Sequence, residues 1–426
     1  MPRIHIFIFA LLALAIGATV WLTSRAAVPR FQGKDVYEWM FESKSSALEN
    51  NPGLMAIGSN AVPFIAEALA LDQTRYDRHR WVRSPAVQRT ARRLGLGFTW
   101  TKSASEVQHS AAWSLLAFSF EAKHALPEIH RDLLRTKNGH RQLMVHCLSE
   151  MGCPPESIPV LVKAWPLTTN ESYNVRHDLL HLFGLGGTNA AKLAMPIAVE
   201  ALSDGNWNVR VVAAQTLGRW GQPNTLAIPP LLALLNSTNG EAAMSAASAL
   251  GRMTNRCDEA VPGVRRLMAS TNDYTVAVAA ITLWRLGGDV TEARRTLESL
   301  LGSKRGKGGA ANFLGQMGPV ARDSVPALLK ASQESIGAWV DMYDRAQCAK
   351  AVLRIGGESA EAYAVLEEAI TTEKNGWVRG TMCREIAQLK ELARPLLPAL
   401  RKALNDPSRD VRHEAARALL RLQGGE

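Results

Sequence analysis

Histidine is the residue type in this chain whose spacing best suits chemistry. His177 and His181 are four positions apart, so on a helix both imidazoles point to one side and can share a metal ion. The run from His177 to His181 copies the helix motif of zinc proteases, except that Asp178 stands where the general-base glutamate belongs. The shorter aspartate misplaces that base, and His146 is the one further ligand candidate. We therefore predict no metal and no catalytic residue. If the protein does bind a metal, the candidate ligands are His146, His177 and His181.

The other residue types that carry chemistry form no recognisable site. The five cysteines include no Cys-x-x-Cys pair, and Cys348 and Cys383 fall at positions where cysteine acts as a small hydrophobic side chain. The glycine-rich run 302–309 lacks the Gly-Lys-Ser/Thr ending and the preceding strand of a phosphate loop. We therefore predict that the protein is not an enzyme and binds no cofactor.

The histidines belong to a pattern that recurs along most of the chain. In its clearest copy Val209, Ala213 and Leu217 form one apolar helix face, Ala214 widens it, and Gly221 ends the helix. With the valine as slot 0, the copies start at Val107, His140, Val175, Val209, Ala242, Val276, Gly306, Asp344, Val378 and Val411. Their spacing is 30 to 38 residues, slots +4, +5 and +8 are apolar in every copy, and many copies carry arginine at +1. A proline then begins a second helix. Such a helix pair buries its apolar faces only by stacking on copies of itself.

The pattern Val-Arg-x-x-Ala-Ala-x-x-Leu-x-x-x-Gly, preceded by Pro-x-Leu-x-x-x-Leu, resembles HEAT repeats, particularly the short HEAT-like units of bacterial repeat proteins. The resemblance covers residues 46–423 and is clearest at 209–214 and 411–419, whereas Gly306 and Asp344 depart from the valine slot. It implies an all-α fold, and we expect a right-handed α-solenoid of about eleven HEAT-like hairpins. The apolar run at residues 4–22 adds one N-terminal apolar helix before them. The resemblance usually implies a protein-binding scaffold, and it supplies no catalytic residues because the signature residues are packing residues.

Composition divides the chain into four expected segments. They are 1–30, a signal peptide or membrane anchor; 31–71, a capping helix and degenerate first repeat; 72–106, a basic insertion; and 107–426, the HEAT-like repeat array. Residues 4–22 are almost wholly apolar, which suits a cleaved secretory signal or an uncleaved anchor. We therefore expect a membrane-anchored protein, or an exported periplasmic or extracellular one if the segment is cleaved. The flanking charges do not decide on which side of the membrane the repeats lie.

The basic insertion carries much of the net charge of +10. Residues 73–102 contain eight basic residues and one acidic residue, with four aromatic residues interleaved among them. This mixture suits an anionic membrane surface, an acidic protein partner, nucleic acid, or simply a solvated loop. We expect no nucleic-acid partner, because an exported chain rarely meets nucleic acid. The candidates for binding an anionic surface are Arg75, Arg78, Arg80, Arg83, Arg89, Arg92 and Arg93.

Slots +2 and +6 lie opposite the packing face, so in stacked units they form a row on the solenoid's inner side. In three successive units this row contains His109, Trp113, His146, His177 and His181. We predict that these residues bind a protein partner, whose identity the sequence does not give, and that the protein is a non-catalytic interaction scaffold of the cell envelope. Two alternatives stay open: a peripheral membrane-organising protein that uses the basic insertion, and an enzyme on a HEAT-like fold, either a lyase or a metal-dependent hydrolase.

Overall fold

The structure is a computed structural model, and it describes residues 28–42, 51–70, 104–118, 123–135, 141–169, 173–253, 257–335 and 341–424. The chain divides into two compact units, Met1–Ile197 and Ala198–Glu426, which we call unit 1 and unit 2 and describe separately. Both are built from helices packed as pairs, so the all-α repeat fold expected from the sequence is confirmed.

Unit 1 begins with an element that the repeat pattern did not predict. Two short strands, β1 (Arg30–Phe31) and β2 (Lys34–Asp35), pair antiparallel around Gln32 and Gly33, whose φ angles are 47° and 78°. The helices that follow are α2 (Val36–Glu42), α3 (Pro52–Ile57), α4 (Val62–Leu69), α7 (Ala104–Phe118), α8 (Leu126–Leu133), α9 (Arg141–Glu150), α10 (Ile158–Ala164), α11 (Tyr173–Leu185) and α12 (Gly187–Ala201). Helix α12 ends just inside unit 2.

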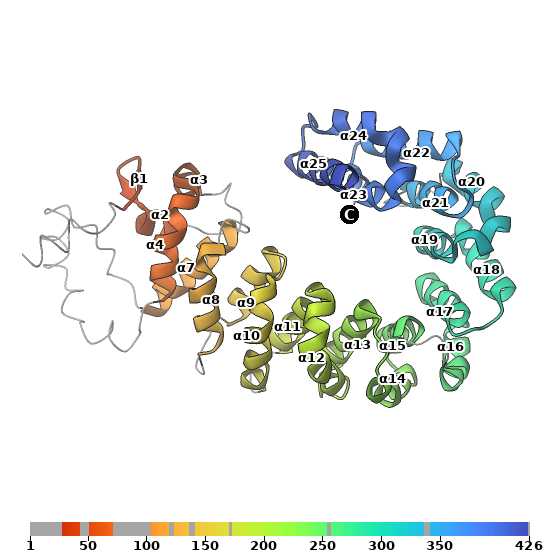
Figure 1. Ribbon diagram of the computed structural model, residues 1–426, viewed down its shortest axis with the longest axis horizontal. Coiled ribbons are helices and arrows are strands. Elements are labelled where there is room, and N and C mark those ends of the chain that lie inside the picture. Colours follow the sequence, from red (N-terminus) through yellow and green to blue (C-terminus); the bar gives the residue numbers. More distant parts are fainter. Residues whose placement is uncertain are drawn as a thin grey trace, which may run out of the picture. The chain divides into compact units, whose positions relative to one another are not determined.

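Unit 2 continues the alternation of helices. Its members are α13 (Trp207–Trp220), α14 (Ile228–Leu235), α15 (Gly240–Met253), α16 (Val261–Leu267), α17 (Asp273–Arg285), α18 (Val290–Ser299), α19 (Lys307–Met317), α20 (Val325–Gln333), α21 (Asp341–Gly356), α22 (Ala360–Thr371), α23 (Gly376–Ile386), α24 (Leu397–Ala403) and α25 (Arg409–Gly424). The odd-numbered helices, which we call B helices, each pack on the next one from α13 to α25. Within unit 2 they lie side by side on the inner side of its curve, and the even-numbered A helices lie outside them (Figure 1).

The A helices begin where the sequence places a proline. Pro63, Pro127, Pro159, Pro229, Pro262, Pro326 and Pro398 all stand in the first two positions of a helix. A proline is tolerated there because the missing N–H would have had no helical partner. Helix α12 differs, since Pro196 lies inside it. The nine residues before Pro196 are already helical, so α12 loses a hydrogen bond in its interior rather than starting at the proline.

The slots that the pattern assigned to packing form the core. In the described copies the +4, +5 and +8 residues are buried, apart from the half-buried Trp284 and Ala416. Trp284 shows that the copy at Val276 was placed one residue too late. Thr275 takes slot 0, three residues after the helix-capping Asn272, and Leu283, which is 1% exposed, takes slot +8. The same three-residue offset separates Asn206 from Val209, so the cap fixes the register where the apolar pattern is ambiguous.

The +1 arginines fasten each B helix to the loop before it. Arg210, Arg379 and Arg412 each donate from Nη1 to the carbonyl oxygens of the residues six and five positions earlier, at 2.7–3.2 Å. These carbonyls follow the end of an A helix, where backbone acceptors lack helical donors. The +1 arginines are therefore structural, and these hydrogen bonds stay within one repeat.

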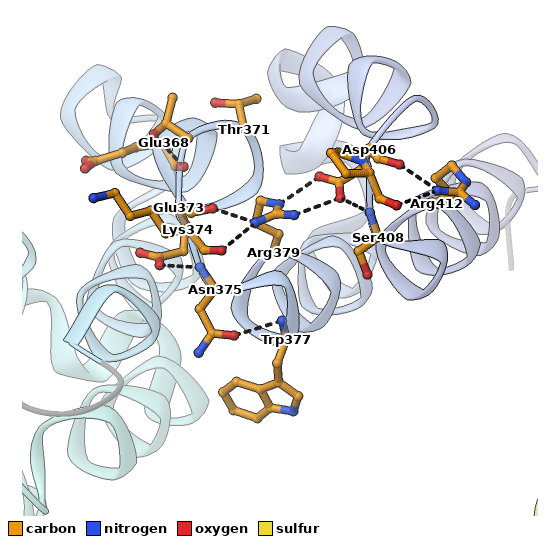
Figure 2. Close-up of polar contacts among 12 residues, drawn as sticks. Glu368, Thr371, Glu373, Lys374, Asn375, Trp377, Arg379, Asp406, Ser408 and Arg412 are labelled. Atoms are coloured by element: carbon orange, nitrogen blue, oxygen red, sulfur yellow. Dashed lines mark hydrogen bonds and ion pairs between the residues drawn. The ribbon is translucent and has the colours of Figure 1, made fainter. Parts of the chain in front are cut away.

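Within unit 2, Arg379 also joins two successive repeats (Figure 2). Its Nε and Nη2 donate to the two carboxylate oxygens of Asp406 at 2.7 and 2.8 Å, and Asp406 accepts a third hydrogen bond from the Ser408 backbone N–H at 2.8 Å. The hydrogen bond from Arg379, followed by that from the Ser408 N–H, holds the pKa of Asp406 below its usual value against the effect of burial. Both side chains are largely buried, so this is a strong bidentate link between repeats.

Two segments singled out in the sequence lie outside the described residues. They are the apolar run 4–22 and the basic insertion up to residue 103; α7 begins at Ala104, within the insertion as we bounded it. Among the helices that the structure does describe, none combines the length and the apolar composition needed to cross a bilayer.

Candidate functional site

The predicted row of histidines lies on three successive B helices of unit 1. His109 and Trp113 are on α7, His146 is on α9, and His177 and His181 are on α11, and these helices pack in that order. His146 is exposed and His181 is half-buried. The Trp113 Nε1–H donates to His109 Nε2 at 3.0 Å, so these two rings are held together at the surface.

The histidines do not assemble into a metal site in the part of the chain that the structure describes. There, no three His, Cys, Asp or Glu side chains come together as metal ligands. His177 Nδ1 instead lies 2.9 Å from Asp178 Oδ1, its sequence neighbour. Asp178 therefore contacts the histidine beside it rather than bridging His177 and His181.

The arginines proposed to bind an anionic surface cannot be placed, because all seven lie outside the described residues. These are Arg75, Arg78, Arg80, Arg83, Arg89, Arg92 and Arg93. The cysteines, by contrast, are all placed: the five thiols are buried and unpaired. Burial raises the pKa of Cys147, Cys153, Cys348 and Cys383 to about 12, which makes them poor nucleophiles.

A different site stands out in unit 2, at the C-terminal ends of the B helices. A groove of 550 Å³ is lined there by the polar side chains of Arg252, Arg285, Asn312, Gln316, Arg354, Glu385 and Gln388. We call it the basic groove. Its floor at one end is formed by Gly218 and Gly221, at the end of α13.

The repeat itself positions the arginines of the basic groove. With the register corrected, Arg252, Arg285 and Arg354 all occupy slot +10, and Arg219 occupies the same slot on α13. This slot falls in the last turn of the B helix, where the helix dipole favours a cation. A glycine at slot +9 lets successive B helices approach closely: a Cβ on Gly218 would lie 3.0 Å from the Ala249 Cα. The cationic side chains of neighbouring repeats are consequently brought together.

The arginines of the groove are held by neutral partners. Arg285 Nη2 donates to Gln316 Oε1, and Arg354 Nη2 donates to Gln388 Oε1 at 3.1 Å. Arg252 has no hydrogen-bond or ion-pair partner among the described residues. An amide orients a guanidinium group without neutralising it, so these contacts fix the geometry and leave the positive charge in place.

The carboxylate of the groove does not offset these charges. Glu385 is bound by Lys350, a nearly buried side chain of α21. Burial, together with the positive charge of Arg252, lowers the pKa of Arg285 to about 10 and lowers that of Arg219 as well. The groove thus concentrates like charges that the protein leaves uncompensated.

Aromatic side chains occupy the opposite ends of the same helices. Tyr274 is 47% exposed and Trp377 is 55% exposed, and Tyr343 packs against Trp377 with ring centroids 5.5 Å apart. Tyr274 and Arg285 are eleven positions apart, as are Tyr343 and Arg354, so the members of each pair face the same side of their helix after about three turns. We call these three aromatic residues the aromatic edge. The surface of unit 2 formed by the B helices, which we call the B face, therefore has an aromatic edge at one end of the helices and a basic groove at the other.

The sequence carries a signal for this site that the apolar repeat pattern does not reveal. Arginine recurs in slot +10 at Arg219, Arg252, Arg354 and Arg421. The fifth member, Arg285, was hidden by the one-residue register error in α17. Slot +10 lies beyond the last apolar position that defines the repeat, so the repeat pattern itself does not include these arginines.

Comparison with known proteins identifies the repeats. The family model of HEAT repeats matches residues 195–285 and 363–426, so both stretches are HEAT repeats. No curated protein sequence matches the chain.

Solved structures of low sequence identity also match the chain, with TM-scores below 0.5 in the three described next. Human deoxyhypusine hydroxylase, in complex with glycerol, is 19% identical over 71% of this chain and 96% of its own, with a TM-score of 0.26. The karyopherin Kap121p, bound to the extreme C-terminus of the protein phosphatase Cdc14p, is 12% identical over 86% of this chain and 46% of its own, with a TM-score of 0.46. Kap95p with RanGDP is 13% identical over 91% of this chain and 61% of its own, with a TM-score of 0.37. The chain thus spans about half the length of Kap121p.

Proposed function

Because this chain is a HEAT-repeat protein, we propose that it is a non-catalytic scaffold that binds a protein partner along the B face of its repeats. HEAT repeats form a helical array suited to protein interaction. The observation that carries the proposal is the B face of unit 2, where the aromatic edge and the basic groove run over successive repeats. Tyrosine, tryptophan and arginine are the residue types that most often dominate the binding energy of protein interfaces.

Exposure of these side chains supports a binding role over a packing role. A tryptophan that is 55% exposed, as Trp377 is, gives up much of the free energy that burial would provide. On a partner's surface the same ring would regain that free energy. The half-buried Tyr343 beneath it holds the ring in place, so little side-chain freedom would be lost on binding.

The cell envelope is the proposed location, and this part of the proposal rests on the sequence. The apolar run 4–22 would anchor the chain or direct its export. The histidine row of unit 1, with His109, Trp113 and His146, is proposed as a further partner-binding surface. Fractionation of cells expressing the full-length chain and a chain lacking residues 4–22 tests the location: equal recovery in the soluble cytoplasmic fraction would contradict it.

Photo-crosslinking tests the proposed binding face. A photoreactive amino acid is placed at Tyr274, Gln316 or Trp377 on the B helices, or at the exposed Arg295 or Arg401 on A helices, in the full-length chain in cells. We expect the B-helix positions to give the same crosslinked partner and the A-helix positions to give none. Crosslinks from the A-helix positions alone would refute the assignment of the face.

A further inference from the structure

We propose that the basic groove binds an extended acidic segment of the protein partner, with one carboxylate at each of Arg252, Arg285 and Arg354. This inference rests on the proposed function and adds the chemistry of the partner. The three arginines come from three B helices, α15, α17 and α21, and line one groove. Guanidinium groups bind carboxylates through two parallel hydrogen bonds, and these groups have N–H donors to spare.

The charge of the groove is prepared for an anion. Gln316 and Gln388 orient two of the guanidinium groups without neutralising them, and Lys350 occupies the carboxylate of Glu385. Bringing like charges together costs free energy in the unbound protein, and an acidic ligand would remove that cost. Preorganised donors also lose little conformational freedom when the ligand arrives.

The spacing of the groove fits an extended polypeptide. Packed helices lie about 8–10 Å apart, and an extended chain rises about 3.3 Å per residue, so one helix corresponds to about three residues. Helices α15 and α17 are neighbours in the stack, whereas α17 and α21 are separated by α19. The expected ligand therefore has carboxylates near positions i, i+3 and i+9, and the amides of Asn312 and Gln316 face the stretch between the last two.

The lining of the groove argues against other anions. None of the residues that line it is aromatic, whereas single-stranded nucleic acid is normally held by bases stacked on aromatic rings. Arg285 and Arg354 are also half-buried, so a flat membrane surface reaches them less readily than it reaches the exposed Arg252. A peptide is narrow enough to enter and presents both carboxylates and backbone amides.

The proposal is tested by fluorescence anisotropy with the full-length chain and a labelled glycine-serine peptide that carries glutamate at i, i+3 and i+9. One variant combines Arg252→Gln, Arg285→Gln and Arg354→Gln. Its matched control combines Arg295→Gln, Arg322→Gln and Arg401→Gln, which removes the same charge from exposed positions of the A layer. We expect the groove variant to bind about tenfold or more weakly and the control to change by less than about twofold.

A gain-of-function variant guards against loss of folding. Asn312→Lys adds a cation inside the groove and is expected to tighten binding of the same peptide about two- to fivefold. Equal weakening by the groove variant and its control would overturn the proposal, because it would show attraction to net charge alone. Tighter binding of inorganic polyphosphate, single-stranded DNA or anionic vesicles than of the peptide would overturn the assignment to an acidic protein segment.

The two proposals fail separately. If the peptide does not bind but the B-helix positions still crosslink one partner in cells, the chemistry of the groove is wrong and the scaffold function stands. If no B-helix position crosslinks while the peptide binds the groove, the proposed face of the scaffold is wrong.

Discussion

Asp344 provides a sharp test of the packing between repeats, because the sequence places a carboxylate where other copies have valine. It lies at slot 0 of α21, is 8% exposed, and has no hydrogen-bond partner among the described residues. Burial raises its pKa to about 6, and the attraction of Lys307 offsets that effect only in part. Gly308 makes room for the carboxylate, since a Cβ there would lie 2.2 Å from Asp344 Oδ1.

The expected effect on stability follows from the change in pKa on folding. The pKa rises from 3.8 to about 6. At about 1.4 kcal/mol per unit, this corresponds to about 3 kcal/mol. The folded state favours the protonated form, so the contribution of Asp344 is fully present below pH 3.8 and is lost as the pH rises through about 6. Substitution by asparagine removes this pH dependence. The free energy of unfolding of Asp344→Asn, minus that of the wild type, should therefore rise by about 2.5 kcal/mol between pH 4 and pH 8, because the unfolded-state carboxyl is already partly ionised at pH 4.

Amide hydrogen exchange of the α19–α21 region, measured by mass spectrometry at several pH values and corrected for the intrinsic rate, reports the local free energy of opening. Each substitution also removes the attraction between Asp344 and Lys307. This adds a constant to the difference in the free energy of unfolding, and that constant does not alter how the difference changes with pH. Asp344→Val serves as the control. Its free energy of opening can differ from that of Asp344→Asn by a constant, but the difference from the wild type must change with pH in the same way. Parallel curves for the wild type and both variants would refute the assignment of a raised pKa.

Three further predictions concern the repeat interfaces and the core. A double-mutant cycle of Arg379→Ala and Asp406→Ala, followed by chemical denaturation, should give a coupling free energy of about 2 kcal/mol at pH 7. This coupling should disappear when acid protonates Asp406, below the lowered pKa of its carboxyl group. Additive effects of the two substitutions would contradict the bidentate link. Gly218→Ala should destabilise by about 1–2 kcal/mol, since its Cβ meets the Ala249 backbone at 3.0 Å, whereas Gly380→Ala, with 3.7 Å of room, should stabilise by up to about 1 kcal/mol in thermal unfolding. The buried thiols of Cys147 and Cys348 should resist iodoacetamide at pH 8 until the protein is unfolded, and fast labelling of the native chain would contradict their burial.

The repeat architecture could be predicted from the sequence because each copy carries its own helix signals. The apolar slots, the capping asparagines and the first-turn prolines are local features, and each specifies the same structure. The apolar pattern alone placed the register of α17 one residue too late. The capping residue Asn272 gives the right register, because slot 0 lies three residues after the cap. Pro196 shows the limit of such a rule, since α12 continues through a proline that begins a helix in other copies.

The candidate site could not be predicted in the same way, because it depends on which side chains of different repeats meet. Arg285 and Gln316 are in different copies, and their hydrogen bond requires the actual packing of α17 on α19. The histidines were predicted as a site from their residue type and spacing, but His177 Nδ1 hydrogen-bonds to Asp178, its sequence neighbour. Arginine at slot +10 is equally periodic and was overlooked, because a cation at a helix C-terminus has an ordinary structural explanation.

An exception to the repeat at slot +9 lies at the basic groove. Gly218, Gly251 and Gly315 at slot +9 let their helices approach the next B helix closely, but α17 carries Trp284 in that slot. An indole cannot fit where a hydrogen atom fits elsewhere, and α17 and α19 approach each other less closely than their neighbours do. Beyond α17 the close approach returns, since a Cβ on Gly315 would lie 3.1 Å from the Ala351 Cα, whereas α21 carries Leu353 at slot +9 and packs less closely on α23. The basic groove takes Arg285 from one side of the looser α17–α19 contact and Asn312 and Gln316 from the other. A cluster of like charges at such a contact is an arrangement that packing alone does not require, and it is the arrangement expected if a ligand binds there.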